Sequence, residues 1–201
     1  MRLLLAASLA LAACGGSGDR VTRAADAMEH LRGVRFSLVA SSVAGGSQAP
    51  GGDLALAYRA TGELAPPDRL RLTLSEPRPA VLVITGPSVT LDGRPASPAV
   101  LRTLASPLAI LEQLREPGRS TFSGLGFARG NITLRYRIDR GERGSVEVEL
   151  GLLDDLVRRQ SFTVSEPAPA DGSGLQVVRT SYVVEYWDYG ALLDLREPRQ
   201  P

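Results

Sequence analysis

The sequence of 201 residues contains no lysine, one cysteine, one histidine and one asparagine, and only 5% of its residues are aromatic. A single histidine, His30, has no visible partners for a metal site or a Ser/His/Asp triad, so a solvated helix residue is expected there. Because Cys14 is the only cysteine, no disulfide can form within the chain. The formal charge is +1. It becomes zero without Arg2, which argues against a basic surface for nucleic acid.

The sequence also lacks an apolar run long enough to cross a bilayer, which needs about 20 residues. Its first apolar run, from Leu3 to Ala13, is interrupted only by Ser8 and follows Arg2. A basic residue before a short apolar run is the layout of a signal peptide. Residues 1–13 are therefore predicted to be a signal peptide and not a transmembrane helix.

The end of this run, Leu11-Ala12-Ala13-Cys14, resembles the lipobox of bacterial lipoproteins, in which cleavage precedes a lipid-modified cysteine. An ordinary signal peptide that happens to precede a cysteine is the alternative. The flanking Gly and Ser residues offer no base for a catalytic thiol. The resemblance implies a protein anchored through Cys14 to the cell membrane or outer membrane, on the extracytoplasmic side. Residues 14–20 would be the lipidated cysteine and a flexible tether.

Residues 21–201 are expected to form one domain, since domains commonly contain about 100 to 200 residues. Apolar residues at helical spacing predict a short helix from Thr22 to Arg32, ended by Gly33. Beyond it the apolar residues recur at every second position, which is typical of strands with one buried face. Strands are predicted at residues 35–43, 53–60, 68–75, 81–85, 89–91, 131–139, 145–152, 156–164 and 176–187.

Short connections rich in Pro, Gly and Asp separate these strands and favour an antiparallel sheet of about nine or ten strands. One segment, Ser97 to Glu116, interrupts the pattern, and its Ser97-Pro98 and Ser106-Pro107 pairs predict the starts of two short helices. The apolar surface of the second helix must lie on the concave side of the sheet. The predicted fold class is α+β, a curved half-barrel closed by a few short helices.

The apolar strand and helix positions are the candidates for a binding surface. They are Leu54, Leu56, Tyr58, Leu70, Leu72, Leu74, Leu108, Leu111, Leu134, Tyr136 and Trp187. Such an aliphatic lining suits acyl chains, and it equally suits a solid core. The pattern alone leaves both interpretations open. Trp187 and Tyr189 are predicted either to gate a cavity or to pack a sheet end.

Three stretches resemble the LolA/LppX-like lipoproteins of bacteria, including the LppX/LprG type. Gly62 to Leu72 carries a Gly and then Pro-Asp-Arg entering an alternating strand, and Glu149 to Arg159 resembles a strand, acidic turn and return strand. Tyr182 to Pro198 contains the turn Trp187-Asp188-Tyr189-Gly190. The Gly-rich insertion Val43 to Gly52 departs from the family pattern. The resemblance implies a curved sheet holding a hydrophobic cavity that binds acylated lipids or lipoprotein acyl chains.

The sequence offers little for catalysis. Asp154-Asp155 could be an acid/base or metal-binding pair, but its place between two strands favours a hairpin turn. Gly124-Leu125-Gly126 lacks the Lys and Ser/Thr of a phosphate-binding loop. We therefore expect no enzyme, no metal and no cofactor. The expected function is lipid binding or transport in the periplasm or cell envelope; the alternative is a scaffold lipoprotein that has a packed core and binds other envelope proteins.

Overall fold

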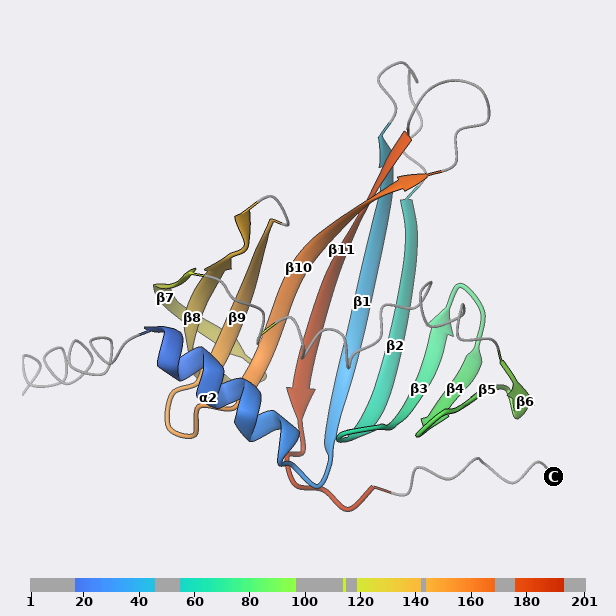
Figure 1. Cartoon of the computed structure of the whole chain (residues 1–201), viewed down its shortest axis with the longest axis horizontal. Coiled ribbons are helices and arrows are strands. Elements are labelled where there is room, and N and C mark those ends of the chain that lie inside the picture. Colours follow the sequence, from blue (N-terminus) through green and yellow to red (C-terminus); the bar gives the residue numbers. More distant parts are fainter. Residues whose placement is uncertain are drawn as a thin grey trace, which may run out of the picture.

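The computed structural model describes residues 17–45, 55–96, 114, 119–141, 144–168 and 176–193. They form one α-helix, α2, and one antiparallel sheet of eleven strands (Figure 1). Among these residues, no helix has the length and apolar character needed to cross a membrane.

Helix α2 spans Ser17–Glu29. The predicted helix is confirmed, but it begins five residues earlier than Thr22 and ends three residues before Arg32. Its first turns are fixed by Arg20, which pairs with the Asp155 carboxylate and donates a hydrogen bond of 3.1 Å to the Leu152 carbonyl. Of the expected tether, residues 14–20, the last four belong to the helix, and residues 14–16 lie outside the described residues.

The strands follow the predicted order along the chain, with two additions. They are β1 Val34–Gly45, β2 Ala55–Ala65, β3 Arg69–Glu76, β4 Ala80–Thr85, β5 Ser88–Leu91, β6 Arg94–Pro95, β7 Arg119–Ala128, β8 Asn131–Asp139, β9 Ser145–Gly151, β10 Val157–Ala168 and β11 Gln176–Trp187. β6 and β7 were not predicted. The short β6 contains a proline, and glycines at 124 and 126 together with a register shift disturb the alternation of β7.

The sheet order is β6-β5-β4-β3-β2-β1-β11-β10-β9-β8-β7. The first and last strands of the chain, β1 and β11, are therefore neighbours at its centre. The outermost strands, β6 and β7, do not pair with each other, so the sheet is open. Figure 1 shows the strands curving, with α2 crossing them at one end. The predicted curved antiparallel sheet is confirmed, with eleven strands in place of nine or ten. The two helices predicted in Ser97 to Glu116 lie, except for residue 114, outside the described residues.

We call the face of the sheet that α2 covers the inner face and the opposite one the outer face. Side chains alternate between the two along each strand, as pleating requires. The inner face and α2 form one buried cluster, which includes Val21, Ala24, Ala25, Met28, Phe36, Leu38, Leu64, Leu70, Leu72, Leu82, Tyr136, Val148, Leu150, Phe162, Val184 and Tyr186. The hydrophobic core thus extends from β4 to β8 across the whole middle of the sheet.

Candidate functional site

The structure brings the predicted binding residues of β2, β3 and β8 onto the inner face. Leu70 and Leu72 are fully buried, and Tyr58, Leu134 and Tyr136 are nearly so. Leu74 is half-buried and packs against the same cluster. Of the other candidates, Cys14, Leu54, Leu108 and Leu111 lie outside the described residues, as does the side chain of Leu56.

Trp187 does not join the other candidates and is corrected here. It pairs across strands with Arg35 on the outer face, because Tyr186, the preceding residue, occupies the inner position. The Arg129 guanidinium lies 3.5 Å from the centroid of the indole ring. Tyr189 packs the end of the sheet, and its hydroxyl donates a hydrogen bond of 2.6 Å to the Val157 carbonyl.

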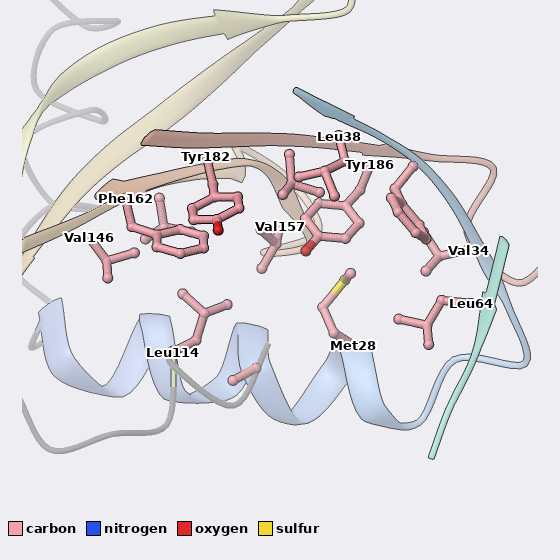
Figure 2. Packing of buried hydrophobic residues seen from close by; sticks show 14 of the residues in the cluster. Met28, Val34, Leu38, Leu64, Leu114, Val146, Val157, Phe162, Tyr182 and Tyr186 are labelled. Atoms are coloured by element: carbon pink, nitrogen blue, oxygen red, sulfur yellow. The ribbon is translucent and has the colours of Figure 1, made fainter. Parts of the chain in front are cut away.

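Central strands supply inner-face residues that the sequence analysis did not select. Figure 2 shows aromatic rings of β10 and β11 above α2, with Met28 and Leu114 pointing toward them. The Phe162 and Tyr182 rings stack with centroids 4.9 Å apart. The alternation in residues 176–187 could have identified Tyr182, but both faces of that strand carry large apolar residues. The face was therefore ambiguous in the sequence.

The inner face also carries polar atoms in an apolar surrounding. The Tyr186 side chain is 1% exposed, and its hydroxyl has no hydrogen-bond partner among the described residues. Burial raises the pKa of Tyr186 well above its ordinary value. Gln160 is fully buried on the same face, one strand away. An unpaired buried hydroxyl is costly, so a hydrogen-bond acceptor reaching Tyr186 would be stabilised there.

The outer face has a polar depression of about 360 Å³ over β1, β2, β3 and β11. It is lined by Arg35, Thr61, Gly62, Glu63, Arg71, Thr73 and Trp187. Arg35 donates hydrogen bonds of 3.2 Å to Glu63 and 2.9 Å to Asp188, and these two bonds raise the pKa of Arg35. This cation is therefore already paired within the protein.

A second polar cluster lies on the outer face over β7, β8 and β9. The Thr133 hydroxyl donates a hydrogen bond of 2.7 Å to Glu149, and the Arg135 guanidinium donates one of 3.2 Å to the same carboxylate. Thr133 and Glu149 are buried although they lie on the outer face. Gly126 of β7 lies against both side chains, and a Cβ atom there would be 2.6 Å from the Thr133 hydroxyl. The polar groups of this cluster are therefore paired with one another within the protein.

The catalytic candidates take structural positions. Asp154 and Asp155 form the predicted hairpin turn, in which Asp154 accepts a hydrogen bond of 3.1 Å from the Leu156 amide and pairs with Arg158. His30 is exposed just after α2. Gly124 and Gly126, which lack the other residues of a phosphate-binding loop, belong to strand β7. In the part of the chain that the structure describes, no three His, Cys, Asp or Glu residues are grouped as a metal site would require.

No protein-family model and no curated protein matches the chain. Solved structures do. The LolA superfamily protein of Nitrosomonas europaea is 9% identical with a TM-score of 0.33, and the match covers 90% of this chain and 95% of that one. LprF of Mycobacterium bovis is 11% identical with a TM-score of 0.45, covering 90% and 96%. The Nitrosomonas europaea protein carries the name of the LolA superfamily, which the sequence motifs resemble.

The MucA/MucB complex of Pseudomonas aeruginosa also matches, at 16% identity and a TM-score of 0.42. The match covers 90% of this chain and 61% of the other chain. The present chain thus spans about three fifths of the length of the matched chain of that complex.

Proposed function

We propose that this protein is a membrane-anchored extracytoplasmic lipoprotein that binds acylated lipids or lipoprotein acyl chains on its inner face. The observation that carries the proposal is the single hydrophobic cluster running from β4 to β8 on one side of an open sheet. An open sheet can part from its cover without breaking strand pairs. An acyl chain could therefore enter between the sheet and α2.

The size of α2 supports this route. A helix of 13 residues is about 20 Å long, whereas ten strand spacings of about 4.8 Å make the sheet wider than 40 Å. Moving α2 therefore exposes a limited part of the face. Burying about ten acyl methylenes there would contribute roughly 8 kcal/mol before ordering costs. Binding of that strength is useful and still reversible, as a carrier requires.

Individual residues take roles in this proposal. Leu70, Leu72 and Leu134 would contact the acyl chain, and α2 would act as the cover. The Tyr186 hydroxyl points toward the side of α2 in Figure 2 and would donate a hydrogen bond to an ester or amide carbonyl of the ligand. Lipid on Cys14 would hold the protein at the membrane.

A second candidate function has its own support. Leu70 and Leu72 are 0% exposed, as residues of a filled core would be. A filled core would make the protein a scaffold that binds another envelope protein through its surface. The two functions differ in whether the inner face has room for a ligand.

Native mass spectrometry on the Cys14→Ala protein, secreted by a lipid-containing bacterial host, tests the proposal. The substitution removes the anchor, so any retained lipid must be held by the fold. One acylated lipid per protein is the result expected. Lipid-free protein that also refuses added fatty acid would refute lipid binding.

A pair of substitutions on one strand sharpens this test. In a ligand cavity, Leu72→Trp fills space and reduces the lipid complement while the protein stays folded. In a filled core the same change costs about 1 to 3 kcal/mol of unfolding free energy. Thr73→Trp is the matched control, because Thr73 is the next residue and faces outward. Lipid loss with both variants would exclude a specific inner-face site.

A further inference from the structure

Four large apolar side chains are exposed together where the sheet ends at β7. Phe122 is 39% exposed, Leu125 53%, Phe127 64% and Ile132 57%. Leu125 pairs with Leu134, and Phe127 pairs with Ile132, on the inner side of the β7–β8 hairpin. We call these four residues the edge patch. Exposed apolar groups gathered in this way mark an interaction surface.

The edge patch continues the buried core. The ring of Phe122 lies edge-on to the ring of Tyr136, with centroids 5.7 Å apart, and Tyr136 is only 2% exposed. β7 is the outermost strand on this side of the sheet. The apolar inner face therefore reaches the molecular surface at this edge.

Another exposed apolar residue lies at the same end of the strands. Leu153, in the turn between β9 and β10, is 97% exposed. Thr133 pairs with Gly151, so Ile132 and Leu153 both lie just beyond that pair, at the start of β8 and the end of β9. The apolar residues of two neighbouring hairpins thus point to one region of the surface.

The N-terminal half of α2 lies beside this region. α2 contacts β7 and β10, and its other end leads through four residues into β1, four strands away from β8 (Figure 1). A helix about 20 Å long can satisfy both only if its N-terminal half is the part near β7. The contact of Arg20 with the Leu152 carbonyl agrees with this placement.

The proposed lipid anchor is close to that helix end. Only three peptide units join Cys14 to Ser17, the first residue of α2, which limits their separation to about 11 Å. A bilayer that holds the anchor is therefore near the edge patch. We infer that the edge patch and Leu153 dock on the surface of this bilayer, so that the inner face opens toward lipid. The inference rests on the anchoring proposed above.

The charges nearby favour docking through apolar contact. Arg20 and Arg23 both pair with Asp155, and Arg158 pairs with Asp154. Three arginines against two aspartates leave a net charge of only +1 in this group for anionic headgroups. Docking should therefore occur on neutral phosphatidylcholine and should depend weakly on salt.

Single-cysteine labelling tests this docking directly. The mature Cys14→Ala chain would carry an N-terminal hexahistidine tag in place of the anchor and would be recruited to phosphatidylcholine vesicles containing a nickel-chelating lipid. Ile132→Cys and Leu153→Cys, labelled with an environment-sensitive fluorophore, report on the docking surface. Asp139→Cys is the control, because it is exposed at the opposite end of β8. The chain has no other cysteine, so each variant has one label.

The expected result is an emission increase of about twofold for the labels at 132 and 153, and little change for the label at 139. Equal responses at all three positions would overturn the inference. An emission increase at position 132 that follows from raising the protein concentration alone would also overturn the inference, because the edge patch would then join copies of the chain. Native mass spectrometry of the same samples reads lipid content separately. Docking without retained lipid would support this inference and refute the carrier function.

Discussion

Neighbouring residues of β1 show how differently the two faces of the sheet are built. Phe36 points inward, is fully buried and lies against the Tyr186 ring with centroids 6.3 Å apart. Ser37 points outward and pairs across strands with Glu185 and Thr61. Packing of apolar side chains stabilises the inner face, whereas the outer face is mostly exposed to solvent.

The outer face nevertheless buries polar residues over β8 and β9, and the means of burial differ. Glu149 is 5% exposed there, and its carboxylate accepts hydrogen bonds from Thr133 and Arg135. A buried carboxylate is tolerated because these partners replace water. The comparison teaches that burial on the inner face depends on shape, whereas burial of these polar groups on the outer face depends on pairing. Substitutions can test each separately.

The largest effect is expected from truncating the inner face. Phe36→Ala should lower the free energy of unfolding by about 3 to 5 kcal/mol, because it leaves a cavity in the core. Ser37→Ala, one residue away, should change it by less than about 0.5 kcal/mol. Urea denaturation followed by circular dichroism measures both. Similar losses for the two variants would contradict the difference between the faces.

The next effect concerns a glycine on each face. A Cβ atom on Gly62 would be 2.7 Å from Cε1 of Phe36 and 2.9 Å from the Arg71 carbonyl, so Gly62→Ala should cost about 2 to 3 kcal/mol. Gly126→Ala meets side-chain atoms of Glu149 and Thr133, which can move, and should cost less. Thermal denaturation compares the two. A larger loss for the outer glycine would reverse this ranking.

Gly62 shows how far the sequence could predict this fold. The resemblance placed it ahead of a strand, and the structure places it inside β2, where the Phe36 ring lies over it. Strong alternation predicted β3 and β8 to within one residue at each end. The period of two is a local property, so it appears in the sequence without knowledge of partners.

The candidate site was predicted less completely. Alternation correctly grouped Leu70, Leu72 and Leu134, but it could not assign Trp187, because β11 carries large apolar residues on both faces. The burial of Glu149 had no signal in the sequence. It depends on β7 lying beside β8, and glycines at 124 and 126 concealed that strand. Contacts between distant segments were therefore the part that local patterns missed.

A smaller effect is expected from the buried carboxylate of the outer face. Glu149→Ala should cost about 1 to 2 kcal/mol, because the Thr133 hydroxyl loses its acceptor in a buried place. Glu149→Gln keeps an acceptor for Thr133 and should recover most of the loss. Chemical denaturation of the two variants gives the difference. An equal loss for Ala and Gln would mean that charge pairing with Arg135 matters more than the hydrogen bond.

The smallest effect at neutral pH is expected at the sheet end. Tyr189→Phe removes the hydrogen bond to the Val157 carbonyl and should cost about 1 kcal/mol. Burial raises the pKa of Tyr189 to about 12, above the value near 10 of an unfolded chain. Its contribution is therefore complete below pH 10 and is lost as the pH rises through 12.

The lack of lysine makes this loss measurable, because no lysine, whose ordinary pKa is about 10.4, ionises in the same range. Tyr189→Phe should make the alkaline fall in unfolding free energy shallower, by up to about 1.4 kcal/mol per pH unit. Urea denaturation of both proteins at pH 9, 10 and 11 measures this slope. Parallel slopes would mean that Tyr189 ionises as readily in the folded protein as in the unfolded chain. The sheet end would then be wetter than the inner face, and burial would not be what positions Tyr189.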